Sequence, residues 1–238
     1  MLEAAFWGLV AASALVIGAA VGIWVPISRR IVAMTMAFGA GALVSALSFD
    51  LTEEAFAQGG TGPTALGLAL GGLTFFIGDV LIERGLGGLT GGKPNNGPAI
   101  VLGALLDGLP ESIVLGASLI GGLGVSISFL AAVFASNFPE GLGAARDLRE
   151  AGRSPGQIML VWVIVALASS VAAAIGFAAL GGMPPEPAAF IQAFAAGAIL
   201  AMLADSLFPE AFRDGGIGVG LATVFGFSIA FFLSVAPS

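Results

Sequence analysis

Two stretches of the sequence place oxygen-bearing side chains at a spacing suited to binding a cation. Residues 107–111 read Asp-Gly-Leu-Pro-Glu, and residues 136–140, which begin 29 positions later, read Ser-Asn-Phe-Pro-Glu. In each of these two motifs the first and last residues lie four apart, so on a helix their side chains share one face. Each motif lies near the middle of a long apolar run. The spacing predicts two helices that each present a pair of oxygen ligands.

A proline precedes the glutamate in both motifs. Proline has no N–H and clashes with the carbonyl four residues earlier, so we expect free carbonyl oxygens near Leu106 and Ala135. A carboxylate at the centre of a bilayer costs roughly 2.5–3.5 kcal/mol unless it is paired, hydrated or bound to a metal. Glu111 and Glu140 therefore indicate a functional site, and our working hypothesis is the transport of a metal ion.

The composition is that of an integral membrane protein. Of the 238 residues, 58% are hydrophobic and 10% are charged, and the mean hydropathy is +1.04, which a soluble domain of this length does not reach. The 37 glycines favour close packing of helices. Because the chain has neither Cys nor His, a metal would be bound by oxygen ligands, with Met thioethers the one soft alternative. The net charge of −7 argues against a nucleic-acid partner.

Apolar segments of about 20 residues, the length that crosses ~30 Å of hydrocarbon, divide the chain. We predict one all-α transmembrane domain, residues 1–238, with eight helices at residues 5–27, 31–56, 64–83, 98–121, 125–148, 157–180, 188–211 and 216–236. Cytoplasmic loops are enriched in basic residues, and all eight basic residues fall in alternate loops: Arg29, Arg30, Arg84, Lys93, Arg146, Arg149, Arg153 and Arg213. Both termini are then predicted to lie outside the cytoplasm, in a plasma or bacterial inner membrane.

An internal repeat relates two parts of the chain. Residues 40–56 and 196–212, which are 156 positions apart, are identical at eight of seventeen positions and both end in Glu-Ala-Phe. The two predicted helices that carry these copies are five apart in order, so they run in opposite directions. The pattern predicts an inverted repeat with a site at the midplane, a plan that recurs in transporters. The helices of the two motifs would lie at its pseudo-twofold axis.

The second motif continues as Ser-Asn-Phe-Pro-Glu-Gly-Leu over residues 136–142. It resembles the ZIP family of divalent-metal transporters, whose fourth and fifth helices carry motifs of the His-Asn-x-Pro-Glu-Gly type. The resemblance covers nearly the whole chain and includes the Gly-Ala-Gly and Glu-Glu-Ala stretches of residues 31–56. It implies eight helices in a 3+2+3 bundle, a homodimer, and zinc, iron or manganese moving into the cytoplasm as substrate, without a cofactor.

The chain differs from the family pattern at the ligand positions. Asp107 and Ser136 stand where the family has histidine, Gly108 where it has asparagine, and Ser169 where the sixth helix commonly has an acid. The ligand set that the resemblance implies is Asp107, Glu111, Ser136, Asn137 and Glu140. A site with three formal negative charges and only oxygen donors favours Mn²⁺, Fe²⁺, Mg²⁺ or Ca²⁺ over zinc.

Further polar residues lie along the predicted transport route. Asp50 and Glu54 lie near the outer end of the second predicted helix, and Asp205 and Glu210 lie near the inner end of the seventh. We interpret them as an entrance and an exit, with Ser169 as a fifth pathway residue. The alternative is that these acids simply lie in the headgroup zone.

Two other functions remain open. The scaffold could have lost metal binding and carry protons or another solute, or it could be a regulatory membrane protein. An enzyme is not predicted, because the Gly-Asp pair at residues 78–79 lies near a helix end, without the second motif of an intramembrane aspartyl protease, and no phosphate-binding loop occurs. Trp7, Trp24 and Trp162 are predicted to be interface anchors or lipid-facing side chains.

Overall fold

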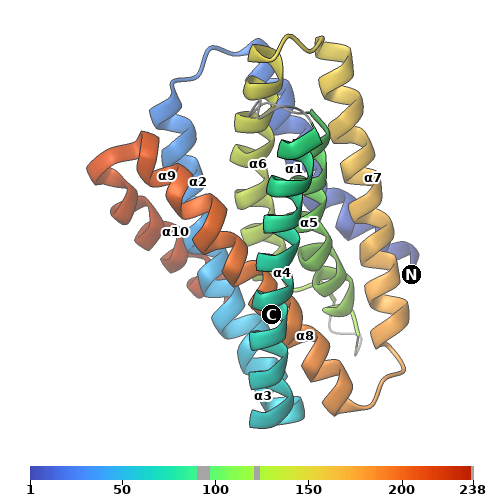
Figure 1. The fold of residues 1–238 in the computed structure, drawn as a ribbon. Helices are drawn as coiled ribbons and strands as arrows, with labels where there is room; N and C mark the ends of the chain where they lie inside the picture. Colours follow the sequence, from blue (N-terminus) through green and yellow to red (C-terminus); the bar gives the residue numbers. More distant parts are fainter. Residues whose placement is uncertain (90–96, 121–123, 237–238) are drawn as a thin grey trace.

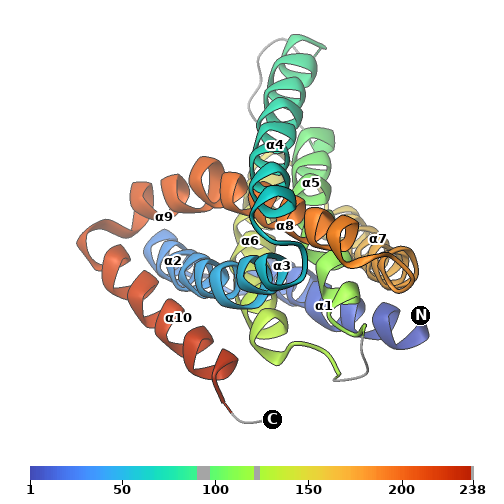
Figure 2. The ribbon, with the colours of Figure 1, turned by 90° about the horizontal axis from the view of Figure 1, so that it is seen from below.

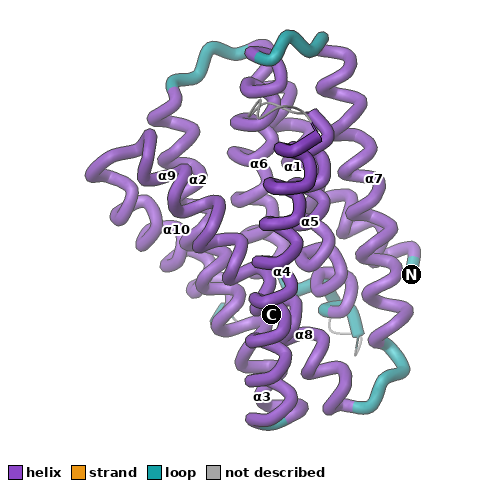
Figure 3. The backbone as a smooth tube through the Cα atoms, viewed as in Figure 1, coloured by secondary structure: helices purple, strands orange, loops and turns teal. Residues whose placement is uncertain are grey.

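The computed structural model describes residues 1–89, 97–120 and 124–236, which form helices and connecting loops without a strand (Figures 1 and 3). The predicted all-α fold class is therefore confirmed. Five helical stretches in this part of the chain are long and apolar enough to cross a membrane: Leu2–Trp24, Arg29–Gly59, Thr61–Ile82, Pro155–Leu180 and Pro185–Ser234. The chain thus has the helices of an integral membrane protein.

Serine side chains fix where several helices begin. The described elements are α1 (Leu2–Trp24), α2 (Arg29–Ala46), η1 (Leu47–Thr52), α3 (Glu53–Gly59), α4 (Thr61–Leu89), α5 (Gly97–Ala117), α6 (Ile127–Glu150), α7 (Pro155–Leu180), α8 (Pro185–Met202), η2 (Leu203–Leu207), α9 (Phe208–Gly215), η3 (Gly216–Gly218) and α10 (Val219–Ser234). Ser28 caps α2, Ser126 caps α6, and Ser154 forms a capping box with Gln157 at the start of α7. Such caps satisfy the free N–H groups of a first helical turn.

The helices pack in pairs through small residues. α1 packs against α6 and α7, α2 against α10, α4 against α8, and α5 against α7, and Figure 2 shows α6 near the centre of the bundle. A Cβ on Gly41 of α2 would overlap the Thr223 carbonyl of α10. Likewise, a Cβ on Gly197 of α8 would overlap the Leu68 carbonyl of α4. Glycine therefore permits the close backbone contact on which helix packing in a bilayer depends.

The two copies of the sequence repeat share a backbone irregularity. α2 changes into the π-helical turn η1 at Leu47, and α8 changes into the π-helical turn η2 at Leu203. These two leucines are 156 residues apart, which is the offset of the repeat. Turns of π-helix are rare in proteins overall, and those that occur often lie at functional sites. Their matching positions indicate that both copies of the repeat adopt the same local structure.

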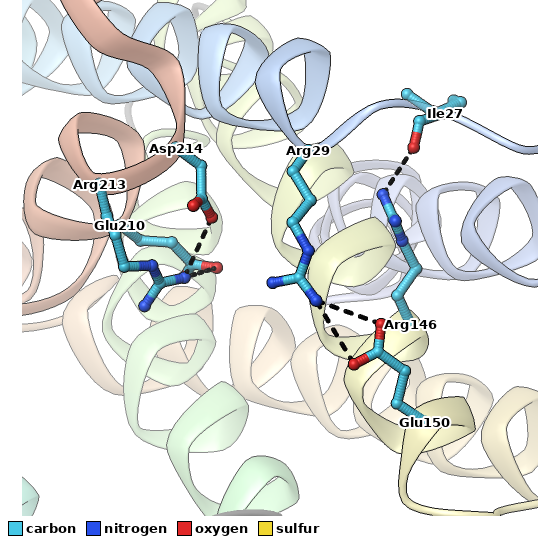
Figure 4. A network of polar contacts seen from close by, with 7 residues as sticks. All are labelled: Ile27, Arg29, Arg146, Glu150, Glu210, Arg213 and Asp214. Carbon is cyan, nitrogen blue, oxygen red and sulfur yellow. Dashed lines mark hydrogen bonds and ion pairs between the residues drawn. The ribbon is translucent and has the colours of Figure 1, made fainter.

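Arg29, Arg146 and Arg213 lie near one another (Figure 4), at the end of the bundle where α2 begins and α6 ends (Figure 1), which we call the arginine end. Arg29 forms an ion pair with Glu150 at 3.2 Å, and Arg146 and Arg149 of α6 donate hydrogen bonds to carbonyls at and just after the end of α1. α3 and the start of α8 lie at the opposite end (Figure 1). Two basic residues used for the predicted topology lie outside the part of the chain whose side chains are described: Arg84 and Lys93.

The position of Trp162 corrects one prediction. Its side chain is fully buried in a cluster with Leu15, Ile158 and Val165, so the assignment to lipid or interface is wrong. The reason is that this face of α7 packs against α1. Trp24, which ends α1, is 62% exposed and keeps the position of an interface residue.

Candidate metal site

The two motifs lie in the middle of α5 and α6, and both helices continue through their prolines. Glu111 of the first motif is 2% exposed. In the second motif Ser136 and Asn137 are buried. One carboxylate of each motif, Asp107 of the first and Glu140 of the second, is partly buried. The five predicted ligands therefore lie inside the bundle rather than on its surface.

The carboxylates of the two motifs are electrostatic neighbours. Glu140 interacts with the charges of Asp107 and Glu111, and also with that of Glu210. None of the ion pairs between described residues involves Asp107, Glu111 or Glu140. Like charges held together without a cationic side chain attract a cation or retain protons. Within the described residues no three acidic side chains converge closely enough to enclose a metal ion, so the carboxylates face a common region without forming a complete coordination shell.

Ser136 and Asn137 are fixed by hydrogen bonds that leave side-chain oxygens for a cation. The Ser136 hydroxyl donates to the Val133 carbonyl at 2.9 Å, the bond back to the preceding turn that hydroxyls in apolar helices form. The Asn137 amide donates from Nδ2 to the Ala11 carbonyl of α1 at 3.4 Å. The donating atoms are the hydroxyl hydrogen and the amide nitrogen, so the lone pairs of both side-chain oxygens are not used in these bonds.

Ser169 lies beside the first motif, as its predicted pathway role requires. It is 3% exposed on α7, and its Oγ would lie 3.6 Å from a Cβ added to Gly108. The missing side chain at Gly108 thus leaves this hydroxyl next to the backbone of α5. The structure brings Ser169 to the first motif without adding a charge to it.

Asp50 and Glu54 meet at a cavity of about 490 Å³, which we call the Asp50 cavity. Asp50 lies on the π-helical turn η1, and its two carboxylate oxygens accept hydrogen bonds from Ser128 at 2.6 Å and Ser234 at 2.8 Å. The remaining lining residues are Phe49, Leu51, Val114, Ser118, Ile120, Gly124, Val125, Ser126, Phe129, Gln192 and Ser234. The predicted entrance residues are therefore brought together, at the end of the bundle opposite the arginine end.

The Asp50 cavity stops close to the motifs. Its wall includes Val114, which lies three residues after Glu111 on α5, a separation of about 4.5 Å along a helix. Phe129 of α6 lines the same wall, and both side chains are almost completely buried. The cavity wall nearest to Glu111 in sequence is therefore apolar, and none of Asp107, Glu111 and Glu140 lines the cavity.

Ion pairs surround Glu210 at the arginine end. Arg213 lies 3.6 Å from Glu210 and 3.3 Å from Asp214, and Figure 4 shows the side chain of Arg29 close by. The cavity between these side chains measures about 30 Å³, the space of one water molecule. Glu210 also lies next to Gly143, one turn beyond Glu140. Glu210 therefore lies close to the Glu140 segment of α6 as well as to the arginine end.

Asp205 lies apart from the other predicted pathway residues. Its side chain is on the exposed face of η2, lines neither cavity, and forms no hydrogen bond or ion pair with a described residue. The residue related to it by the repeat offset is Phe49, which packs on Phe227 and Phe231 of α10. The two repeat copies thus differ in chemistry at this position.

Sequence reasoning missed Gln192. This residue of α8 is 7% exposed, lines the Asp50 cavity and donates a hydrogen bond to Glu54. A signal was available, because an amide inside an apolar helix is costly and marks a site in the same way as an acid.

The chain matches no protein-family model, and no curated protein matches it.

Proposed function

We propose that this protein is a divalent-cation transporter whose central site is formed by α5 and α6. The observation that carries the proposal is the set of carboxylates at Asp107, Glu111 and Glu140, one buried and two partly buried, which interact with one another and have no cationic partner among the described residues. Such a group is unfavourable in a bilayer unless a cation compensates it. Asn137 and Ser136 contribute neutral oxygens to the same site.

The two ends of the bundle support alternating access. The side with Asp50 and Glu54 opens into a cavity of about 490 Å³, and the side with Glu210 and Arg213 leaves about 30 Å³. The cavity beside Asp50 is thus far larger than the one beside Glu210, and a separate cavity of about 420 Å³ lies at the arginine end between the end of α1 and Arg146, Arg149 and Glu150 of α6. A cation enters at the Asp50 cavity, passes Val114 and Phe129, binds the central carboxylates, and leaves past Glu210 when the arginine end opens.

The proposed topology has eight membrane spans. They are α1, α2 to α3, α4, α5, α6, α7, α8 to α9, and α10, arranged 3+2+3 as an inverted repeat with both termini outside the cytoplasm. The matching π-helical turns η1 and η2 and the gathering of arginines at one end support this arrangement. We also propose that the chain is a divergent ZIP-family member, a homodimer in a plasma or bacterial inner membrane, and not an enzyme.

The ligand chemistry favours cations that accept oxygen donors. The candidate ligands are carboxylates, one amide and one hydroxyl, the groups that Mn²⁺, Mg²⁺ and Ca²⁺ prefer. A second candidate function, proton-linked carriage of another solute, rests on one observation: no three acids of the described chain converge on one point. Protons held by Glu111 and Glu140 would satisfy that geometry.

Uptake into proteoliposomes separates the two functions. The purified protein is reconstituted with a fluorescent Mn²⁺ indicator or a pH indicator trapped inside, and an inward Mn²⁺ gradient is applied. Metal transport predicts a Mn²⁺ signal well above that of protein-free vesicles. Adding Zn²⁺ outside the vesicles should lower this signal, because the two ions compete for one site. The Glu3→Gln variant, which removes an exposed carboxylate at the start of α1, serves as the charge-matched control and should transport normally. The proposal is refuted if none of the ions Mn²⁺, Fe²⁺, Mg²⁺ and Ca²⁺ enters the vesicles, each tested with its own indicator.

A further inference from the structure

The Asp50 cavity contains a buried polar atom that lacks a partner. Gln192 is more than nine-tenths buried, and its Oε1 forms no hydrogen bond with the described residues. A buried carbonyl oxygen without a donor is unfavourable, and native proteins rarely leave one unless a ligand satisfies it. Gln192 lines the cavity together with Asp50 and Glu54.

The orientation of the Gln192 amide follows from its neighbour. Its nitrogen donates a hydrogen bond to the Glu54 carboxylate, so Oε1 is the atom left over. Rotating the amide by half a turn would place Oε1 against the carboxylate and lose this bond, which is electrostatically unfavourable. Glu54 is also held by Gln58, whose Nε2 donates to Oε1 of Glu54 at 2.9 Å. Two amides thus position one carboxylate at the cavity.

Asp50 is oriented towards the same cavity by hydroxyl groups. Ser128 and Ser234 each donate to one of its carboxylate oxygens, and each of these oxygens keeps a further lone pair. Asp50 and Glu54 repel each other electrostatically, and neither forms an ion pair with a basic residue of the described chain. Two carboxylates and the Gln192 side chain, whose buried Oε1 lacks a partner, therefore surround one cavity of about 490 Å³.

We propose that Asp50, Glu54 and Oε1 of Gln192 form a second divalent-cation site in the Asp50 cavity, with water completing the coordination. Oxygen donors of this kind suit a hard divalent cation such as Mn²⁺ or Ca²⁺. The site is separate from the central carboxylates because none of Asp107, Glu111 and Glu140 lines the Asp50 cavity. Its role, to concentrate the cation before it reaches Glu111 and Glu140, rests on the proposed transport function, but its existence does not.

Counting bound Mn²⁺ tests the proposal on the purified full-length protein. Free Mn²⁺ gives a six-line electron paramagnetic resonance signal that is lost on binding, so titration yields the number and affinity of bound ions. In a Glu111→Gln, Glu140→Gln double variant, the proposal predicts one remaining Mn²⁺. Adding Glu54→Gln or Gln192→Leu should weaken that ion at least tenfold. Glu53→Gln, which removes the neighbouring exposed carboxylate outside the cavity, should change it less than twofold.

Gln192→Glu gives a result that misfolding cannot imitate. A carboxylate in place of the amide adds a negative charge to the site, so Mn²⁺ should bind at least tenfold more tightly to this variant in the double-variant background. The proposal is overturned if Gln192→Glu does not tighten binding, or if the double variant binds no Mn²⁺ while the unmodified protein does. In the latter case the central site stands. If instead the double variant binds as many ions as the unmodified protein, the central site fails and the Asp50 site stands.

Discussion

Replacing Glu111 with glutamine should separate metal binding from folding. The side chain is 2% exposed and has no cationic partner among the described residues, so Glu111→Gln keeps its size and removes a buried charge. A neutral amide is less costly in the membrane than an uncompensated carboxylate. The metal-free variant should therefore unfold at the same temperature as the unmodified protein or at a higher one, whereas a structural role would lower it.

The response to Mn²⁺ should change in the opposite direction. At an Mn²⁺ concentration of 100 Kd, binding stabilises the folded state by about 2.7 kcal/mol, which for a chain of this length raises Tm by about 5–11 °C. If losing a charged ligand weakens binding about a hundredfold, the same concentration equals Kd, and the stabilisation falls to about 0.4 kcal/mol, or about 1–2 °C. Thermal unfolding of the detergent-solubilised protein, with and without Mn²⁺, measures both quantities.

Glu150→Gln is the matched control for this measurement. Glu150 pairs with Arg29 at the exposed arginine end, where an ion pair contributes about 0–1 kcal/mol. Its metal-dependent shift should equal that of the unmodified protein. The reasoning is refuted if Glu111→Gln keeps the full Mn²⁺ shift, or if it lowers Tm without metal by more than the control does.

Three other predictions follow from the packing and the topology. Ser169→Ala should change Mn²⁺ uptake less than twofold, because α7 supplies no charge to the site; a loss as large as that from Glu111→Gln would place a second ion there. Gly41→Ala should lower the free energy of unfolding in denaturant by about 1–3 kcal/mol, because the new methyl overlaps the Thr223 carbonyl. Gly62→Ala, whose methyl meets open space, should not destabilise the protein. Equal stabilities of the two variants would contradict the close contact at Gly41. Cysteines at Gly62 and Gly156 should react with impermeant maleimide from opposite sides of the membrane, Gly62 from outside, and the reverse labelling contradicts the topology.

The helices were predictable because the apolar runs and their punctuation are local features. Arg29 and Arg30 end one apolar run, and Ser154 and Pro155 form a helix start that can be read in four residues. The π-helical turns were not predictable, since nothing in residues 47–52 differs from an ordinary helix in composition. They depend on packing around the turn, although the repeat did predict that the two copies would be alike.

The candidate site was predictable where charge reveals it and not where packing decides. Glu111 and Glu140 stand out in apolar runs, and the structure places them as electrostatic neighbours. Trp162 was misassigned because sequence alone does not say which face of a uniformly apolar helix meets another helix. Gln192 carries a local signal, an amide inside an apolar helix, but its partner Glu54 lies 138 residues away in the chain (192 minus 54), so only the fold shows which site it belongs to.

The central claim is that buried carboxylates of α5 and α6 carry the transported ion. Radioactive Mn²⁺ uptake into proteoliposomes by the Glu111→Gln, Glu140→Gln double variant tests it most directly, with protein orientation and amount matched to the unmodified protein. If these carboxylates bind the transported ion, the double variant shows uptake no greater than that of protein-free vesicles and retains its helical fold by circular dichroism. Uptake at the rate of the unmodified protein would contradict it, since the two glutamates would then only shape their helices.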